Sequence, residues 1–387
     1  MQINQVHELV NGASAQVTGG SAVLNEDLSN TVDLGNTIQN LDDWANKFLN
    51  ALVDHIGRVV FVNRPYPGLA PSVLRDAWEY ASIMEKIASE MPDAVENESW
   101  ELTDGVSYDP FVYKAPRAEA KFFNKRTTFE LDRSIMDRQL RSAFSNATQL
   151  NAFVSMLYNE VEKSMTIKND ALIMRTISNF IAETLYADHP GGTYSGRTGI
   201  KAVNLLYMYN QRFSENLSAD AAITDAGFLR YASYQMGLYA DRLRRMSVLF
   251  NVGGKQRFTP SDMLHIIYLS EFEKAAGVYL YDAANQFNSD ALKFPRAEVV
   301  PFWQGSGTDY GFASTSKINV TTQAEHTVEA GGILGVMFDR DALGVMNENS
   351  RVTTQYNAKA EFTNYFYKRD AQYFNDLNEN FVVFYVA

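Results

Sequence analysis

The chain has 387 residues, of which 46% are hydrophobic and 13% aromatic, and this composition is typical of a folded protein. It is long enough to bury a substantial core, and by size it could hold two or three domains. Its formal charge of -12 at pH 7, from 46 acidic and 34 basic residues, argues against tight, general binding of nucleic acid. The absence of cysteine excludes disulfides, thiolate metal sites and cysteine nucleophiles.

The first 35 residues are polar and rich in Asn, Ser and Gly, which predicts an N-terminal arm. Their start, MQINQVHELVNGASAQ, has neither the basic residues nor the apolar core of a signal peptide, and no stretch of the chain approaches the roughly 20 apolar residues of a membrane span. Residues 36–57 then predict a helix that Gly57 ends. Its apolar residues recur at three- and four-residue steps: Ile38, Leu41, Trp44, Ala45, Phe48, Leu52 and Ile56.

Residues 58–132 read as one long excursion, a pair of strands with an elaborated tip. The predicted strand Arg58–Val62 opens it, and Ser72 is expected to cap a helix that runs to Glu90. Further extended segments are expected at 100–102, 111–113 and 122–131. Because proline lacks a donor, the proline density excludes the centre of a regular sheet. Six of the ten prolines lie here: Pro65, Pro67, Pro71, Pro92, Pro110 and Pro116. So long an insertion in a compact domain indicates an interaction arm.

The strongest helical pattern covers residues 149–186, with one slip in phase near Lys168. A helix of nearly forty residues, with a possible interruption at that slip, far exceeds the mean of about eleven to twelve. Its apolar stripe comprises Leu150, Phe153, Val154, Leu157, Val161, Met165, Leu172, Met174, Ile177, Ile181 and Leu185.

Residues 197–330 predict a unit of mixed helices and strands. Helices are expected over 227–250 and from Pro260 through Phe272, and a buried strand over 298–303. The final block, residues 331–387, is rich in strand patterns. It holds an apolar run at 333–338, a charged corner at 339–341, aromatic alternation over 362–367 and an apolar last strand at 381–386. A terminal strand that must be buried indicates a structural protein more than a catalytic one.

Few residues suggest chemistry. The five histidines lie far apart at His7, His55, His189, His265 and His326, so a metal site would need a coincidence of tertiary structure. Gly305–Ser306–Gly307 begins like a dinucleotide-binding loop, but the next glycine is Gly311 and Asp309 would face phosphate, which favours a flexible loop. Asp339 and Asp341 could form an acid–base pair. A charged strand-to-helix corner, with Asp341 capping a helix at 342–345, is favoured.

Two further sets were weighed for contact with nucleic acid. Arg242, Arg244 and Arg245 follow a predicted helix, and a solvated helix end or a subunit contact is favoured because cations suit a helix C-terminus. An aromatic set could stack bases, but it lacks interleaved basic residues beyond Lys368 and Arg369, which favours core or interface packing. That set is Tyr365, Phe366, Tyr367, Tyr373 and Phe374. The sequence therefore predicts no catalytic, cofactor-binding or metal-binding residue.

Taken in order, the polar arm, the long excursion, the overlong helix and the buried C-terminal strand resemble the major capsid proteins of tailed bacteriophages, which have the Hong Kong 97-like fold. The likeness is nearest to small short-tailed phages, of podovirus or picovirus type, that infect Gram-positive bacteria. Three segments carry the resemblance: DHIGRVVFVNRP from Asp54, KRTTFELDRSIMDRQLRSAF from Lys125, and GVMFDRDALGVM from Gly335, which is common across the wider family.

This resemblance implies an α+β fold in six parts. They are an N-terminal arm (1–35), an N-terminal helix (36–57), an extended loop with an inserted helix (58–132), a peripheral domain with the spine helix (133–196), an axial domain (197–330) and a C-terminal return into the peripheral domain (331–387). Some relatives append an immunoglobulin-like domain, whereas this chain stops at Ala387.

The same resemblance implies a structural subunit, not an enzyme, without cofactor or membrane. It would assemble with itself, as pentamers and hexamers, into the icosahedral or prolate head shell around double-stranded DNA. It would be found in the virion, and in the host cytoplasm during assembly. A separate scaffolding protein, a portal protein and weak, non-specific contact with the packaged DNA are the other expected partners. Two alternatives stay open: the shell subunit of an encapsulin compartment, and an α/β enzyme with an unrecognised site.

Overall fold

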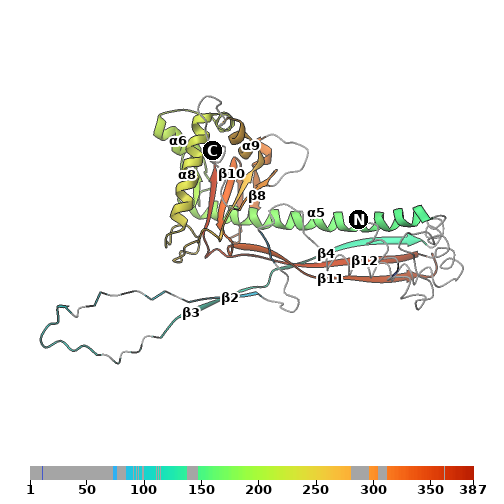
Figure 1. Cartoon of the computed structure of the whole chain (residues 1–387), viewed down its shortest axis with the longest axis horizontal. Helices are drawn as coiled ribbons and strands as arrows, with labels where there is room; N and C mark the ends of the chain where they lie inside the picture. Colours follow the sequence, from blue (N-terminus) through green and yellow to red (C-terminus); the bar gives the residue numbers. More distant parts are fainter. Residues whose placement is uncertain are drawn as a thin grey trace.

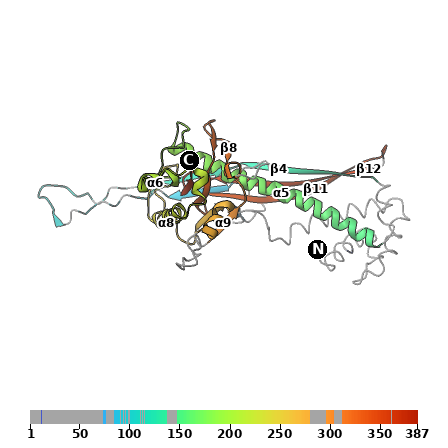
Figure 2. The same ribbon diagram turned by 90° about the horizontal axis from the view of Figure 1, so that it is seen from above.

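A computed structural model describes residues 73–75, 84–89, most of 91–136, 147–279, 296–303, 312–360 and 362–387, together with Asn11. An upright unit of strands and helices stands on one end of a long, flat platform, and a loop projects from the base of the upright unit (Figure 1). Seen from above, this loop and the far end of the platform lie at opposite ends of the molecule (Figure 2). The predicted arm, the helix at 36–57, the strand Arg58–Val62 and the loop from Gly305 lie outside the described residues.

The upright unit is built on a five-stranded sheet with the order β5-β13-β10-β6-β7. Its strands are β5 (Ala202–Asn204), β6 (Leu264–Leu269), β7 (Ala297–Val300), β10 (Ile333–Asp339) and β13 (Phe381–Tyr385). Every residue of β6, β10 and β13 is buried, which explains why these strands read as continuous apolar runs. Strand β13 pairs antiparallel with β10 and parallel with β5, so the predicted last strand lies inside the sheet.

Four helices accompany this sheet: α6 (Leu205–Phe213), α7 (Ala219–Ala222), α8 (Ala226–Leu243) and α9 (Ser270–Tyr279). Asn204 caps α6 and Asp225 caps α8, each side chain accepting a hydrogen bond from a backbone N–H of the first turn. Helix α8 ends at Leu243, seven residues before the predicted end at Phe250. Among the described residues, no helix is long and apolar enough to cross a membrane.

The predicted helix from Pro260 through Phe272 is wrong. Residues 264–269 form strand β6, and only Ser270 begins a helix. Leu264, Ile267 and Tyr268 have helical spacing, but the whole run LHIIYL is buried, and periodicity cannot separate a short buried strand from a helix. The predicted buried strand at 298–303 forms a strand, β7, over its first part, but only Val300 of β7 is buried and Val299 is 40% exposed.

Helix α5 (Ala147–Asp188) has 42 residues without interruption and confirms the predicted long helix. It runs along the platform, packed on strands β12, β11 and β4 (Figure 1). Ile173, Ile177 and Ile181 are fully buried, as their four-residue spacing requires. The platform itself is a four-stranded sheet with the order β1-β11-β12-β4. Its strands are β1 (Leu74–Arg75), β4 (Arg126–Met136), β11 (Leu343–Asn357) and β12 (Phe362–Asn375).

The sheet buries one face of β12 towards α5. Tyr365 and Tyr367 are 1% and 6% exposed, while Phe366 between them is half-buried. Tyr365 is the cross-strand partner of Arg133, and Arg133 pairs with Glu160 of α5, which identifies the face beneath the helix. The aromatic alternation seen in the sequence is thus the period-two burial of a strand that supports the long helix.

Two short hairpins complete the described structure. Strands β8 (Ile318–Thr321) and β9 (Thr327–Ala330) form one, preceded by the single turn α10 (Phe312–Thr315), and β2 (Met84–Ser89) and β3 (Ala118–Phe123) form the other. The predicted helix from Ser72 to Glu90 is therefore wrong where it is described, because Met84–Ser89 alternates in burial and pairs with β3. The expected segment at 122–131 is divided between β3 and β4, and no strand forms at 100–102.

The corner at Asp339–Asp341 joins two strands. The backbone N–H of Asp341 donates to Asp339 Oδ1 at 2.9 Å, and β11 starts at Leu343, so the predicted helix capped by Asp341 does not form. The N–H of Ala342 donates to Asp339 O at 2.9 Å and closes a turn, and the N–H of Asp376 donates to Ala342 O at 2.7 Å. Residues 331–387 are divided between the two sheets, since β10 and β13 belong to the upright one and β11 and β12 to the platform. The domain boundaries themselves remain predictions.

One residue of α5 is expected to weaken the fold. Asn169 is fully buried, and neither atom of its amide has a hydrogen-bond partner. An unpaired buried amide costs about 1–3 kcal/mol, so Asn169→Leu should raise the free energy of unfolding by about 1 kcal/mol or more, measured by urea denaturation. Asn179→Leu, on the half-buried side of the same helix, is the matched control and should change it by less than about 0.5 kcal/mol. A destabilised Asn169→Leu variant would contradict this reading.

Candidate assembly surface

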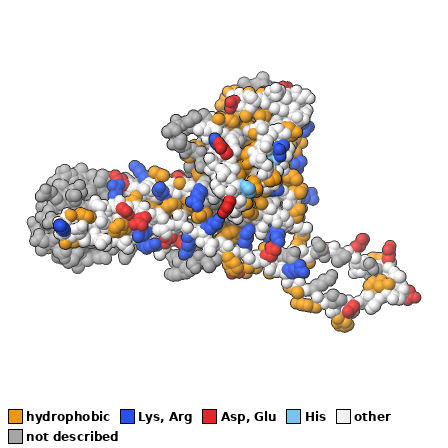
Figure 3. Space-filling model, turned by 180° about the vertical axis from the view of Figure 1, so that it is seen from behind, with side chains coloured by type: hydrophobic (Ala, Val, Ile, Leu, Met, Phe, Trp, Pro, Cys, Tyr) orange, Lys and Arg blue, Asp and Glu red, His pale blue; other side chains and the backbone are white. Residues whose placement is uncertain are grey.

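The segment between β2 and β3 carries an unusual amount of exposed apolar surface. We call residues 91–117 the projecting loop; it extends away from the rest of the molecule (Figures 1 and 3). Trp100 is 96% exposed, Phe111 88% and Tyr113 85%. Met91, Leu102, Val106 and Tyr108 are exposed as well. Apolar surface gathered in this way on a projection marks a surface that another macromolecule covers.

The base of the projecting loop is fixed by a buried carboxylate. Lys86 of β2 and Lys121 of β3 are direct cross-strand partners, so two positive charges stand side by side. Both donate to Asp376, each at 2.9 Å, and the Asp376 side chain is only 3% exposed. Lys86 also donates to Glu379 Oε1 at 2.6 Å. We call these four residues the root cluster.

Electrostatics at the root cluster favour the charged forms. Burial alone would raise the pKa of Asp376, but hydrogen bonds from Lys121 and Lys86 outweigh it and lower the pKa below its ordinary value. Burial likewise opposes the charge on Lys86, and the hydrogen bonds to Glu379 and Asp376 raise its pKa nonetheless. Two outer ion pairs, Lys255–Glu119 at 2.6 Å and Arg257–Glu379 at 3.4 Å, tie the hairpin to the segment after α8.

Removing the shared carboxylate should loosen the hairpin. Asp376→Ala leaves Lys121 facing Lys86 with Glu379, which pairs with Lys86, as the remaining counter-charge of the root cluster. We expect a loss of about 2 kcal/mol in the free energy of unfolding at pH 7, less than for a fully buried pair because both lysines are partly exposed. Since the pKa of Asp376 is lowered by folding, its contribution is complete above about pH 4 and disappears as the pH falls through the folded-state pKa.

The measurement is urea unfolding of wild type and Asp376→Ala between pH 7 and pH 3, and the difference between them should shrink towards pH 3. Glu329→Gln removes the partner of Lys317 in an exposed pair and is the control, with little expected change. A difference that stays constant across this range would show that the carboxylate charge does not stabilise the hairpin.

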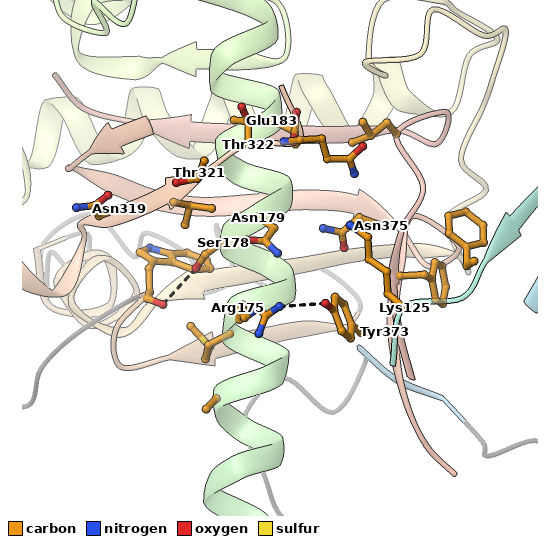
Figure 4. Close-up of a pocket in the computed structure, with 18 of the residues that line it drawn as sticks. Lys125, Arg175, Ser178, Asn179, Glu183, Asn319, Thr321, Thr322, Tyr373 and Asn375 are labelled. Atoms are coloured by element: carbon orange, nitrogen blue, oxygen red, sulfur yellow. Dashed lines mark hydrogen bonds between the residues drawn. The ribbon is translucent and has the colours of Figure 1, made fainter. Parts of the chain in front are cut away.

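A groove of about 1090 Å³ lies beside the same hairpin (Figure 4). Helix α5 forms one wall, and the end of β8, the end of β12 and residues 121–125 form the others. Arg175 donates to the hydroxyl of Tyr373 at 3.0 Å and lies over its ring, and Ser178 Oγ donates to Trp303 O at 3.4 Å. Glu183 accepts the backbone N–H of Gln323. These polar groups hold the long helix against its neighbours.

The two sets weighed for contact with nucleic acid have structural roles. Arg242 lies over the ring of Tyr239 and Arg244 pairs with Asp241 at 3.2 Å, as suits a helix end. In the aromatic set, Tyr365, Tyr367 and Phe374 are buried, which confirms core packing for these three. Burial raises the pKa of Tyr367 to about 12.

The histidines do not meet. Three are described: His189 contacts the Tyr385 hydroxyl at 3.1 Å, His265 stacks on Phe338, and His326 stacks on Tyr186. Burial, reinforced by nearby arginines, lowers the pKa of His265 to about 4. Within the described residues, no group of three His, Asp or Glu side chains could hold a metal ion. His7 and His55 lie outside them.

The two carboxylates of the corner have different environments. Asp339 is 5% exposed, and its burial raises its pKa. Asp341 is more exposed and pairs with Arg75 at 3.3 Å. Each carboxylate therefore stabilises a turn between strands. The larger group of charged side chains is the root cluster, which the sequence did not predict. Its signal in the sequence is weak, because Lys86 and Asp376 are 290 residues apart.

Solved structures with a similar fold come from phage heads. A chain of the capsid structure of Staphylococcus phage Andhra matches with a TM-score of 0.50 and 9% identity, covering 84% of this chain and 87% of that one. A chain from the structure of the head fiber and inner core protein gp22 of native bacteriophage P68 matches to the same extent. The fold is therefore the α+β fold of phage capsids, as the resemblance implied.

The sequence identifies the group within this class. The chain belongs to the Phi29-like phage major capsid protein family, whose profile matches residues 6–385. A curated relative is the major capsid protein of Bacillus phage GA-1, 22% identical over 328 residues. That alignment covers 83% of this chain and 56% of the relative, so the chain spans a little over half of the relative's length.

Proposed function

We propose that this chain is the repeating subunit of a phage head shell, icosahedral or prolate, that encloses double-stranded DNA. Copies would associate as pentamers and hexamers, first in the host cytoplasm and finally in the virion. The observation that carries this proposal is the projecting loop, whose large apolar side chains are exposed in a single copy of a chain from this family. A shell subunit needs such surfaces, because each copy must contact several others.

The projecting loop is proposed to lie across an adjacent copy. Each arm of the loop has about fourteen residues and could span about 45 Å if fully extended, well beyond the edge of its own subunit. In the same scheme, α5 is the spine helix of the peripheral domain (133–196), and strands β5 to β7 with helices α6 to α9 belong to the axial domain (197–330). Strands β10 and β13 of the C-terminal segment (331–387) complete the sheet of that unit. The arm, the N-terminal helix, the extended loop and the C-terminal return keep the boundaries given above.

The other partners are proposed from the resemblance to tailed-phage capsid proteins and from the charge of the chain. A separate scaffolding protein and a portal protein would direct assembly. Contact with packaged DNA would be weak and non-specific, because a subunit with a net charge of -12 gains little from binding a polyanion. Tight, saturable binding of duplex DNA by the free subunit at physiological salt would contradict this.

Negative-stain electron microscopy of the purified chain, at rising protein concentration, tests the main proposal. Regular shells or rings of five or six copies are the expected result. Monodisperse monomers at every concentration, with and without the other head proteins of the phage, would overturn it. No observation in the structure favours an encapsulin compartment or an enzyme.

A further inference from the structure

The segment between α8 and β6 presents an exposed surface of its own. We call residues 242–258 the basic turn. Its two arms are joined by a pair of 3.0 Å hydrogen bonds between Ser247 and Arg257, which form an isolated antiparallel bridge. Met246 is 48% exposed, and Val248, Leu249 and Phe258 are exposed to a similar degree. In a single copy, therefore, this turn leaves a small apolar cluster without cover.

The bridge sets the direction of these side chains. Arg257 reaches the root cluster through Glu379, so the face of the bridge that carries Arg257 is directed towards the hairpin. Side chains alternate along a strand, which places Met246, Val248 and Phe258 on the opposite face, away from the root cluster. Basic and apolar side chains lie close together at the foot of the upright unit, where the projecting loop leaves it (Figure 3).

The basic turn and the projecting loop have opposite net charge. The turn has five basic residues and no acidic one: Arg242, Arg244, Arg245, Lys255 and Arg257. Residues 93–109 of the loop have six acidic residues and no basic one: Asp93, Glu96, Glu98, Glu101, Asp104 and Asp109. Both surfaces also expose large apolar side chains. The two surfaces are therefore complementary in charge, and each has exposed apolar side chains that contact with the other would bury.

In this structure the loop extends away from the turn of its own chain and, among the described residues, contacts it only at the base of the hairpin (Figure 1). The β2–β3 ladder and the root cluster aim the hairpin outwards, and Lys255 pairs with Glu119 at its base. In both ribbon views the tip lies far from α8 (Figures 1 and 2). The occupant of the turn must come from another molecule.

We propose that the projecting loop of one copy docks on the basic turn of a second copy. The inference rests on the proposed shell function and names the surface that receives the loop. Donor and acceptor are different surfaces, so the contact is heterologous and repeats head to tail until it closes a ring. Apolar contacts, led by Trp100 against the Met246 cluster, supply the attraction, and the charges fix the orientation and make association sensitive to salt.

Charge reversal tests the pairing. A loop variant carries Glu96→Lys, Glu101→Lys, Asp104→Lys and Asp109→Lys, which changes the net charge of residues 93–109 from -6 to +2. A turn variant carries Arg242→Glu, Arg244→Glu and Arg245→Glu, which changes the net charge of residues 242–258 from +5 to -1; Lys255 and Arg257 are left intact because they hold the hairpin. Each variant alone should associate at least tenfold more weakly than wild type in analytical ultracentrifugation. An equimolar mixture should recover association, because reversed loops match reversed turns. Lys274→Glu with Lys359→Glu, both far from either surface, is the control and should behave as wild type.

Cysteine cross-linking reads the contact directly, since the chain has no cysteine of its own. Copies with Thr103→Cys are mixed with copies carrying Gln256→Cys and treated with a short bis-maleimide, which also captures transient encounters. Cross-linked dimers that need both variants, and that decrease at 1 M salt, support the inference. If shells or rings form but charge reversal has no effect and no such dimer appears, the inference is overturned while the shell function stands. If the wild type does not associate and the mixed cysteine variants do not cross-link, both fail.

Discussion

Replacing residues 90–117 with Asn-Gly is expected to leave the fold intact and to abolish assembly. Ser89 and Ala118 are a cross-strand pair, so a two-residue turn can join them without changing the hairpin ladder. The large side chains removed are exposed, and the midpoint of thermal unfolding should change by no more than a few degrees. Assembly, measured by sedimentation and electron microscopy, should fall below detection, because each copy loses the surface that covers its neighbour.

Tyr356→Ser is the control for the loss of an exposed aromatic side chain. Tyr356 is 50% exposed on β11 and distant from the loop, so this variant should assemble as the wild type does. Shells of normal size and yield from the shortened chain would show that the loop does not join subunits. A shortened chain that unfolds at a much lower temperature would instead show that the loop supports its own subunit.

The largest effect on stability is expected at Phe381. Its ring stacks on Phe180 of α5 at 4.0 Å between centroids and lies 5.8 Å from Phe338 of β10, so it joins the long helix to the upright sheet. Phe381→Ala should lower the free energy of unfolding by about 3–5 kcal/mol, through lost burial and the cavity left behind. That is a large part of the roughly 5–15 kcal/mol that most domains possess.

Urea unfolding followed by circular dichroism measures this change. Val278→Ala, at a 66% exposed position of α9, is the matched control and should change the free energy of unfolding by less than about 0.5 kcal/mol. A loss below about 1 kcal/mol at Phe381 would mean that the helix and the sheet are joined elsewhere.

Strong periodicity predicted the main elements of the fold. Helix α5 and strands β10, β12 and β13 are long or uniformly buried, so local pattern and tertiary packing agree in them. The prediction failed in the segments where local pattern and tertiary packing disagree. Met84–Ser89 reads as part of a helix, but its pairing with β3 decides its conformation. In LHIIYL almost every residue is apolar and all are buried, so some of its apolar residues fall at helical spacing although the segment is a strand.

The assembly surface was predicted in part. The length and proline density of residues 58–132 indicated an interaction arm, and the exposed Trp100 agrees with that reading. The root cluster could not be predicted, because no local pattern joins a lysine in a hairpin to a carboxylate near the end of the chain. Such contacts follow from the topology, which a single sequence does not reveal.

The position of β13 has a consequence for the order of folding. Strand β5 pairs with β13, and Asn204 Nδ2 donates to Ala387 O across 183 residues of sequence. At about 5–20 residues per second, a ribosome needs roughly ten to forty seconds to make the chain between them. During that interval the edge of β5 has no partner strand, and the same holds for one edge of β10 once residues 333–339 have been made. Folding that depends on such distant contacts is slow. Nascent subunits are therefore expected to need chaperones, which would cover these strand edges until the sheet can close.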